Sequence, residues 1–469
     1  MGPIGWTWRT AIRVLFCSSE VAPFAKTGGL ADVAGSLPLA LGKQGIDVLI
    51  LMPKYRGIEG VQKSLSDRVS VRFVEHEAYF NRSGLYGNGG GDYADNLERF
   101  TFFSRECLRL AEALDYKPDV VHAHDWHTAL LPVLLKTEFS NHFFYKKTRT
   151  VLTLHNLAYQ GHFPASEYEG LGLPKDLFSV DGFEFYGKIN LLKAGILFAD
   201  RLNTVSPGYA KEIQMPEFGF GLENVLKKKK NRLSGILNGI DTDAWNPKTD
   251  PKISASYSPE SLEGKKKCKK VLQELCGFKA NPGVPLLAVV TRLAEQKGLD
   301  ILAGAAPRLF SKDLQLVLLG EGDAHYRRLF ETIASQYSKN VRFFPEFAAD
   351  RAHAIYAGAD LFLMPSLFEP CGLGQMISMR YGTIPVVHAT GGLKDTVLDA
   401  DRDLKTGNGF TFDAANSTDF MNAMDRALKA FKDEMRWKAL ISSAMKTDFS
   451  WTQSAQQYEK LYRETLVKS

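Results

Sequence analysis

Short apolar runs alternate with amphipathic stretches along most of the chain. The apolar runs are rich in Val, Ile and Leu, and several of them end on a polar residue or a glycine. This alternation is typical of parallel strands joined by helical crossovers, so the predicted fold class is α/β with two doubly wound sheets in sequence. We predict strands at 13–18, 47–52, 119–124, 149–155, 201–206 and 233–237, and then at 286–291, 314–319, 341–344, 361–364 and 384–388.

A stretch rich in Pro, Ser and Lys follows residue 246 and runs to about residue 264. The length of 469 residues also exceeds what one ordinary core accommodates. We therefore predict one doubly wound domain over residues 1–248 and a second over 249–450, with a flexible glycine-rich loop at 86–92. In such sheets ligands bind beyond the carboxyl ends of the strands, so two facing domains would place the chemistry in a cleft between them.

Composition narrows the class of protein. Apolar residues make up 45% and charged residues 24%, as in soluble globular proteins, and the net charge of +5 is too small to favour a nucleic-acid partner. No apolar run approaches the roughly 18 residues of a membrane span, and the first ten residues lack the apolar core of a signal peptide. Five cysteines without CxxC spacing predict neither disulfides nor zinc, so we expect a reducing compartment, either cytoplasm or plastid stroma.

The first predicted strand leads into the motif KTGGL at 26–30 and then into a helix-like stretch at 31–41. Its glycines allow the backbone to approach a ligand closely, and amides at a helix start beside Lys26 form an anion site suited to phosphate. A tight strand-to-helix turn with an incidental surface lysine needs the same glycines. This motif alone leaves both interpretations open.

Two further strands end on histidine-containing motifs. HAHDWH at 122–127 admits a metal site, buried hydrogen-bonded histidines, or a sugar-binding carboxylate at Asp125. Strand alternation splits neighbouring side chains between two faces and no carboxylate cluster accompanies them, which disfavours a metal. In the next motif, the imidazole of His155 and the amide of Asn156 suit recognition of sugar hydroxyls, although a core histidine fits the same position.

In the second half, Arg292 and Lys297 lie five positions apart on one loop, TRLAEQKG, directly after a strand. Two such cations can embrace a diphosphate and stabilise negative charge that grows on a leaving group. The alternative is a surface loop tied by salt bridges. Cation spacing alone does not separate these two interpretations.

The segment PSLFEPCGLGQ at 365–375 leads from a strand into a helix and is the most specific motif of the chain. Glu369 stands where a catalytic or hydroxyl-binding carboxylate is expected, and free amides from Cys371 to Gly374 would receive sugar or phosphate oxygens. No general base neighbours Cys371, so we expect this residue to pack or donate its amide rather than act as a nucleophile.

Together these motifs resemble those of the starch and glycogen synthases that use ADP-glucose, glycosyltransferase family 5. The resemblance runs from about Val14 to the C-terminus through KTGGLADV, HAHDWH, LHNLAYQG, LNGIDTDAWNP, TRLAEQKG, FEPCGLGQ, YGTIPVV and TGGL. It implies a GT-B fold, two Rossmann-like domains facing a deep cleft, with a helix at 451–469 that crosses back to the first domain. It also implies retaining transfer of glucose from ADP-glucose to an α-1,4-glucan or maltooligosaccharide without a cofactor or metal, and domain closure would complete the site.

The resemblance also assigns roles to single residues. The catalytic set would be Glu369, Asp125, His155, Arg292 and Lys297. Substrate binding would fall to Lys26, Gly29, Asn156, Asn238, Phe347, Cys371, Gly372, Leu373 and Gly374. Within these sets, Arg292 and Lys297 would hold the distal phosphate and Phe347 would stack on adenine.

Two positions depart from the expected pattern. Gly374 stands where many members carry threonine, and Ile377 replaces the second glutamate of broader retaining GT-B families. The second departure favours this family over sucrose-phosphate-type synthases.

Three rival hypotheses are a transferase for UDP-glucose or another acceptor, a dinucleotide oxidoreductase, and a non-catalytic glucan-binding protein. The chain lacks the GxGxxG arrangement expected of a dinucleotide oxidoreductase. Its intact motifs argue against a non-catalytic protein.

Overall fold

The computed structural model describes residues 11–88, 91–346, 348–402 and 406–467, which form two compact units. Unit 1 holds the described residues up to Val205, Ala210–Gly239, and the chain from Trp451 onward, whereas unit 2 holds Ser206–Tyr209 and Ile240–Ser450. The change of unit at Ile240 comes before the boundary predicted after residue 248. The reason is that Ile240 is bridged to Ser450, and its N–H donates to the carbonyl of Phe449 at 2.8 Å.

The sheet of unit 1 has eight strands in the order β13-β12-β8-β7-β1-β2-β4-β3, and its pairs are parallel apart from the β3–β4 edge. The strands are β1 (Arg13–Cys17), β2 (Asp47–Pro53), β3 (Gln62–Ser66), β4 (Val69–Val74), β7 (Val120–His124), β8 (Arg149–Leu154), β12 (Arg201–Thr204) and β13 (Leu233–Gly235). The six predicted strands are confirmed because parallel strands buried on both faces form continuous apolar runs. The β3–β4 pair was missed because β3 is a polar, exposed edge strand and β4, VSVRFV, is not a continuous apolar run.

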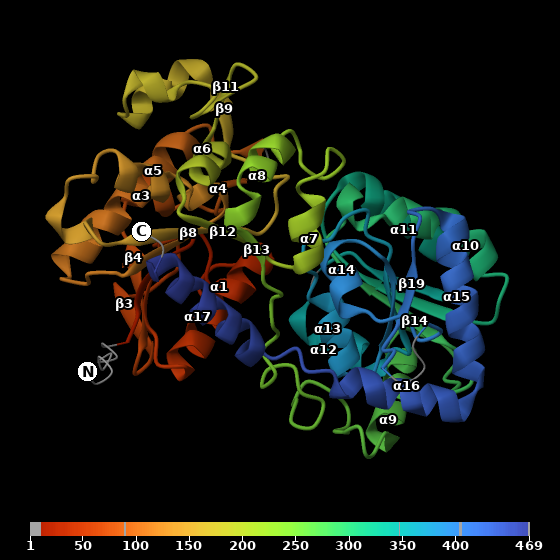
Figure 1. Ribbon diagram of the computed structural model, residues 1–469. Coiled ribbons are helices and arrows are strands. Elements are labelled where there is room, and N and C mark those ends of the chain that lie inside the picture. Colours follow the sequence, from red (N-terminus) through yellow and green to blue (C-terminus); the bar gives the residue numbers. More distant parts are fainter. Residues whose placement is uncertain (1–10, 89–90, 347, 403–405, 468–469) are drawn as a thin grey trace. The chain divides into compact units, whose positions relative to one another are not determined.

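Helices cover both faces of this sheet, with α1 and α17 packed together on one face and α3, α5 and α6 on the other (Figure 1). Their bounds are α1 (Gly29–Lys43), α2 (Glu77–Phe80), α3 (Asn96–Ala113), α4 (Asp125–Thr128), α5 (Leu130–Lys136), α6 (Leu191–Phe198), α8 (Glu223–Lys228) and α17 (Trp451–Val467). The chain passes from unit 2 to unit 1 within α7 (Pro207–Glu212). No helix among the described residues has both the length and the apolar character that crossing a bilayer demands.

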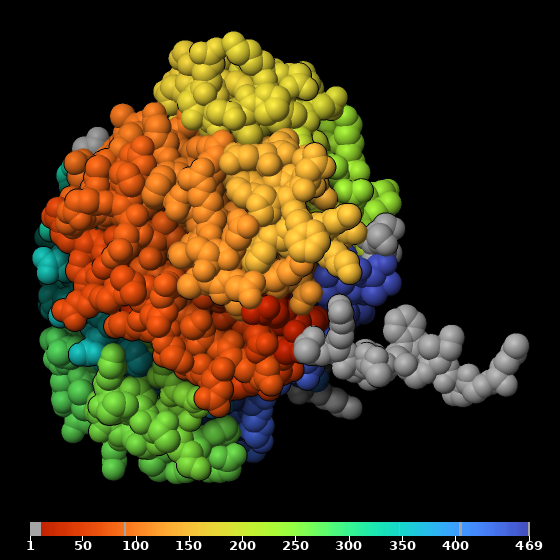
Figure 2. Space-filling view, turned by 90° about the vertical axis from the view of Figure 1, so that its left-hand side faces the viewer, coloured from red at the N-terminus to blue at the C-terminus, as the bar shows by residue number. Residues whose placement is uncertain are grey.

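A small antiparallel sheet belongs to the segment that stands out from unit 1 in yellow in Figures 1 and 2. Its order is β10 (Glu184–Phe185), β11 (Lys188–Asn190) and β9 (His162–Pro164). The loop predicted at 86–92 instead contains a short hairpin of β5 (Gly87–Asn88) and β6 (Gly91–Asp92), while positions 89 and 90 lie outside the described residues. Short 3-10 helices occur at η1 (Phe143–Tyr145), η2 (Ala165–Leu171), η3 (Lys175–Leu177) and η4 (Lys230–Arg232).

Unit 2 has a fully parallel sheet of six strands in the order β16-β15-β14-β17-β18-β19. The strands are β14 (Leu286–Val290), β15 (Gln315–Leu319), β16 (Val341–Phe344), β17 (Leu361–Met364), β18 (Ile384–His388) and β19 (Phe410–Phe412). The helices are α9 (Glu263–Leu275), α10 (Leu299–Leu309), α11 (Ala324–Gln336), α12 (Ala349–Gly358), α13 (Gly374–Arg380), α14 (Gly391–Thr396), α15 (Ser417–Lys432) and α16 (Glu434–Lys446), with the turn η5 (Glu295–Lys297). The five predicted strands are confirmed, and the three-residue β19 was missed.

Both sheets reverse their strand order beside the first strand. In unit 1, β1 lies between β2 and β7, and Leu15 pairs with Leu49 on one side and Val121 on the other. In unit 2, β14 lies between β15 and β17. Ligands of doubly wound sheets bind beyond the carboxyl ends of the strands at this reversal. Predicted binding motifs follow β1 and β7 in unit 1 and β14 and β17 in unit 2, so the topology places them at these reversals, and the His155 motif follows the adjacent strand β8.

Candidate active site

A buried carboxylate holds the loop that follows β1. Glu20 Oε2 accepts the N–H of Thr27 at 2.5 Å and that of Gly28 at 3.3 Å, while Oε1 accepts the hydroxyls of Thr27 and Tyr86, each at 2.6 Å. Glu20 was not among the predicted site residues; the only signal in the sequence is an acidic residue shortly after an apolar strand. The loop is therefore fixed just before Gly29, the exposed first residue of α1.

Lys26, predicted to bind phosphate, lies on this same loop and is exposed. Its ammonium pairs with the carboxylate of Asp32, in the first turn of α1, at 2.6 Å. An exposed ion pair of this kind contributes little to stability, so an anionic ligand can compete for the lysine at small cost. The structure thus places Lys26 beside Gly29, at the start of a helix.

Asp125 begins α4 directly after β7 and has a left-handed backbone with φ of +53°. Its Oδ1 accepts the N–H of His155 at 2.7 Å, and the N–H of Asn156 also bonds to this carboxylate. Burial raises the pKa of Asp125 to about 7, although the two backbone N–H groups oppose that shift. Left-handed non-glycine residues are uncommon and cluster at functional sites. The structure therefore brings the predicted residues Asp125, His155 and Asn156 together.

The histidines of this region are joined by buried hydrogen bonds. His122 shares one with the Tyr462 hydroxyl at 2.8 Å and another with Thr153 Oγ1 at 2.7 Å, and His124 Nδ1 lies 2.9 Å from His155 Nε2. Burial lowers the pKa of both His122 and His155 to about 3, so these imidazoles are neutral near pH 7. In the described part of the chain, no three side chains of His, Cys, Asp or Glu are grouped as a metal ion would require.

Asn238 follows β13 and is also buried. Its Oδ1 has no hydrogen-bond partner among the residues that the structure describes. A buried acceptor left in this way costs about 1–3 kcal/mol, which a ligand hydroxyl would recover by donating to it. Asn238 therefore has an acceptor available to a ligand, and its role in sugar binding stays a prediction.

In unit 2, Lys297 and Glu369 form an ion pair between the loops that follow β14 and β17. Lys297 Nζ lies 2.7 Å from Glu369 Oε2, and the two side chains are 15% and 8% exposed. The Ser366 hydroxyl donates to the same oxygen at 3.1 Å. The two loops are also joined by the N–H of Leu367, which donates to the carbonyl of Gln296 at 2.9 Å. The structure thus brings together two predicted residues that are far apart in sequence.

Two glycines allow the loops of unit 2 to approach each other closely. A Cβ on Gly298, where φ is +60°, would lie 1.9 Å from the carbonyl oxygen of Pro365. A Cβ on Gly392 would lie 2.4 Å from Cα of Cys371, and the N–H of Gly392 donates to the carbonyl of Glu369 at 3.0 Å. Both glycines are required because backbone occupies the space that a side chain would need.

The predicted amide donors lie at the start of α13. Cys371 is buried, Gly372 has φ of +74°, and Leu373 precedes the first helical residue, Gly374. A Cβ on Gly374 would come within 3.0–3.1 Å of the ring of Phe362, closer than ordinary contact. The glycine that departs from the family pattern thus fits the position of this ring, and threonine would require the ring to move.

Arg292 and Phe347 complete the predicted set. Arg292 is exposed, and within the described residues its side chain makes no hydrogen bond or ion pair, unlike Lys297. In the part of the chain that the structure describes, Arg292 is therefore not part of a surface salt bridge, as the alternative interpretation of this loop expected, and it is available to a ligand. Phe347, predicted to stack on adenine, lies outside the described residues.

Comparison with known proteins identifies the family. Residues 13–228 match the family described as "Starch synthase catalytic domain", and residues 277–440 match "Glycosyl transferases group 1". A glycogen synthase of Geotalea daltonii is 46% identical, over 97% of this chain and 99% of its own length. Glycogen synthase 2 of Geobacter sulfurreducens is also 46% identical, over 96% and 98%. This chain belongs to the starch and glycogen synthase family.

Solved structures show the same relationship. The catalytic domain of starch synthase IV from Arabidopsis thaliana, bound to ADP and acarbose, matches with a TM-score of 0.89 at 37% identity, over 98% of this chain and 100% of that one. Sucrose-phosphate synthase from Thermosynechococcus elongatus, with a TM-score of 0.64 at 18% identity, shares the fold alone. The predicted GT-B fold is confirmed, and the protein is a glycosyltransferase of glucan synthesis.

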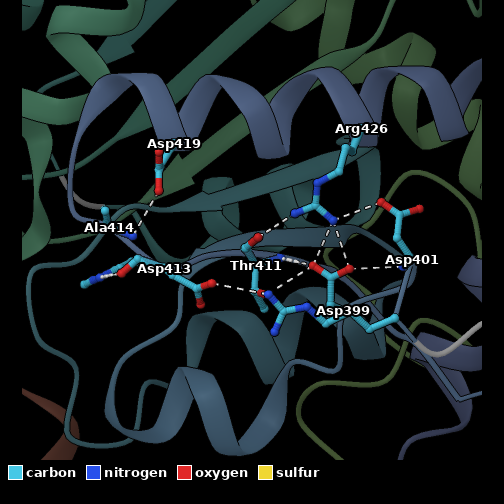
Figure 3. Close-up of polar contacts among 9 residues, drawn as sticks. Asp399, Asp401, Thr411, Asp413, Ala414, Asp419 and Arg426 are labelled. Atoms are coloured by element: carbon cyan, nitrogen blue, oxygen red, sulfur yellow. Dashed lines mark hydrogen bonds and ion pairs between the residues drawn. The ribbon is translucent and has the colours of Figure 1, made fainter.

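This synthase also has a cavity of about 370 Å³ in unit 2 that none of the predicted site residues lines. Arg426 lines this cavity, and Figure 3 shows its contacts with Asp399 and Asp401; the N–O distances are 2.9 to 3.0 Å. Although burial opposes the shift, hydrogen bonds from Thr411 and Arg426 lower the pKa of Asp399. The paired charges join the segment after α14 to α15, and Arg426 also donates to the Thr411 carbonyl of β19 at 2.6 Å.

Proposed function

We propose that this enzyme transfers glucose from ADP-glucose, with retention of configuration, to the non-reducing-end 4-hydroxyl of an α-1,4-glucan. The observation that carries the proposal is the Lys297–Glu369 pair, on loops at the carboxyl ends of β14 and β17, with Arg292 exposed on the first of these loops. ADP departs as an anion, and cations that meet its growing charge lower the barrier. The ADP bound to the Arabidopsis relative supports this choice of leaving group.

Arg292 and Lys297 are the proposed ligands of the diphosphate, together with the amides of Leu373 and Gly374 at the start of α13. The same role is proposed for Lys26 and the Gly29 amide in unit 1, where a second helix begins. Arginine contributes a planar fork of donors and lysine a compact charge, so the two types complement each other around phosphate oxygens. Phe347 is the proposed contact of the adenine ring.

The residues proposed to bind the transferred glucose are polar groups that are either neutral or already paired. Glu369 and the amides of Cys371 and Gly372 are its proposed partners in unit 2. In unit 1, the proposed partners are Asp125, His155, Asn156 and Asn238. A neutral imidazole and amide oxygens suit hydroxyl recognition because each offers a donor or an acceptor without the desolvation cost of a charge.

The proposed reaction takes place on one face of the sugar. The bond from glucose C1 to the phosphate oxygen breaks, a new bond forms from C1 to O4 of the acceptor, and the acceptor proton passes to the departing phosphate. Two observations favour this route over a double displacement. Glu369 Oε2 already accepts from Lys297 and Ser366, and burial raises the pKa of Asp125 to about 7, which lowers the fraction of that carboxyl ionised for attack.

A transfer assay tests the proposal. Purified enzyme is incubated with a maltooligosaccharide and either labelled ADP-glucose or labelled UDP-glucose, and the products are separated by length. We expect stepwise elongation from ADP-glucose, with new linkages that an α-1,4-specific amylase cleaves. Glu369→Gln should lose most of this turnover. Failure of the wild-type enzyme to elongate the oligosaccharide from ADP-glucose would contradict the proposal.

A further inference from the structure

Two aromatic residues of unit 1 hold an unfavourable backbone conformation at the surface. Tyr186 has φ of +49° and is 84% exposed, and Phe220 has φ of +48° and is 40% exposed. Tyr186 and Gly187 form the two-residue turn between β10 and β11, where Asn-Gly is the favoured sequence. A bulky residue with positive φ is strained, and an exposed ring gains little from burial. Folding alone does not account for these two rings.

The two residues belong to one surface. The rings of Phe185 and Tyr186 lie 4.7 Å apart at 81°, and Phe185 packs on Gly221, where an added Cβ would meet Phe185 Cζ at 2.8 Å. Gln160 stabilises the Phe220–Gly221 turn, because its Nε2 donates to the carbonyl of Phe220 at 3.1 Å. The β10–β11 hairpin and the Phe220–Gly221 turn are therefore held against each other.

The small sheet extends this surface. Cross-strand pairing places Phe185 and Lys188 on one face, and alternation along β9 and β11 puts His162 on that face too. The rings of His162 and Phe185 are stacked, 5.5 Å apart and 11° from parallel. We call His162, Phe185, Tyr186 and Phe220 the aromatic platform; its members on β9 and on the β10–β11 hairpin belong to the yellow segment of Figures 1 and 2.

The opposite face of the small sheet connects the aromatic platform to the candidate site. Ile189 is fully buried there, and Phe163 meets the ring of Trp126 at 5.8 Å. Trp126 directly follows Asp125, and a Cβ on Gly161 would come within 2.7 Å of the Trp126 ring. The same short sheet thus packs inward on a neighbour of Asp125 and presents aromatic rings outward.

We propose that the aromatic platform binds an α-1,4-glucan chain, at a surface distinct from the residues assigned above to donor and glucose. The inference rests on the proposed function, which supplies the ligand. Glucose rings present flat C–H faces that pack on aromatic rings and a rim of hydroxyls that need polar partners. Exposed Lys188 provides such a partner beside Phe185, whereas a lipid or protein partner of purely apolar character would leave this charge unpaired.

Glycine substitutions test the proposal without harming the backbone. Tyr186→Gly and Phe220→Gly remove the rings and also suit the left-handed conformation, so thermal unfolding midpoints should stay the same or rise. The measurement is retardation of the purified enzyme in native gels that contain glycogen. We expect each variant to bind glycogen about tenfold more weakly, the loss typical of one well-packed aromatic contact. The KM for glycogen should rise in parallel, while the KM for ADP-glucose should not.

Phe143→Ala is the matched control, because Phe143 is also an aromatic residue of unit 1 and is 81% exposed. It should bind glycogen like the wild type. Should Tyr186→Gly fail to fold, Tyr186→Asn repeats the test, since Asn also tolerates positive φ. Equal glycogen affinity in the wild type and both platform variants overturns the proposal, as does an equal loss in Phe143→Ala. A wild type that binds glycogen through the platform but never extends it from ADP-glucose contradicts the proposed function instead.

Discussion

The two units handle charge differently at the ends of their strands. In unit 1, burial lowers the pKa of His155 to about 3 and raises that of Asp125 to about 7, so the groups there favour their uncharged forms. In unit 2, Lys297 and Glu369 form an ion pair at 2.7 Å, and Arg292 is exposed on the same loop as Lys297. Asp125 and His155 are thus suited to neutral hydroxyls, and Arg292 and Lys297 to an anion, the two kinds of group that the proposed transfer from a nucleotide-sugar presents.

The largest expected effect comes from breaking the ion pair of unit 2. Lys297→Ala should lower kcat with ADP-glucose and glycogen by about a hundred- to a thousandfold, as loss of one transition-state donor does. The variant also leaves the buried carboxylate of Glu369 without its cation. Initial rates at saturating substrate measure the effect.

The control for this variant is Lys269→Ala. Lys269 forms a similarly buried pair with Asp360 at 2.7 Å in the same unit, with side chains 8% and 10% exposed, and no role in catalysis is assigned to it. This variant should lose stability but keep kcat in the folded fraction. An equal loss of kcat in both variants would show that any broken buried pair in unit 2 produces the effect.

The next effect sharpens the comparison within unit 1. Because the pKa of Asp125 is raised in the folded state, the native protein resists ionisation of this carboxyl, and stability is lost as pH rises from 4 toward 7. Asn does not ionise, so Asp125→Asn removes this pH dependence. Between pH 4 and 7 the free energy of unfolding of the wild type should fall by about 3 kcal/mol relative to that of the variant. Urea unfolding of both proteins at several pH values measures the difference. Parallel stability curves would contradict the buried environment of Asp125.

The buried histidines predict a dependence of stability on pH that is opposite in sign to that of Asp125. Their pKa values are lowered on folding, so below pH 6.5 the unfolded chain binds more protons and stability falls as pH falls. Between pH 6.5 and 5, each such histidine should lower the free energy of unfolding by about 1–2 kcal/mol. In His155→Gln, the free energy of unfolding measured with urea should fall by that much less between pH 6.5 and 5 than it does in the wild type. His325→Gln, at an exposed histidine of α11, is the control and should leave the slope as it is.

The smallest effect concerns the last helix. Tyr462→Phe removes the partner of His122 Nδ1 and should reduce the free energy of unfolding by about 1 kcal/mol, with kcat retained. Urea unfolding at pH 7.5 measures it. A variant as stable as the wild type would mean that the hydrogen bond between α17 and β7 contributes nothing to unit 1.

Several site residues could be predicted from their local setting, and others could not. Lys26, Asp125, His155 and Lys297 each follow an apolar run, and the topology then brings them to the carboxyl ends of strands. Glu20 also follows an apolar strand, but its role depends on the Tyr86 hydroxyl and on backbone N–H groups of the next turn, which the local sequence does not reveal. The platform residue Tyr186 was equally invisible, since no sequence pattern reveals a positive φ at a tyrosine.

By itself, the sequence determined the α/β class, most strands and the motif positions, because strands buried on both faces must be continuously apolar and close backbone contacts must be glycine. Only the tertiary structure decided which of these motifs meet. Lys297 and Glu369 are separated by 72 positions, and they touch because β14 and β17 are neighbours in the sheet. Burial likewise decided that His122 and His155 are neutral near pH 7, because desolvation depends on the whole surrounding fold and not on the adjacent residues.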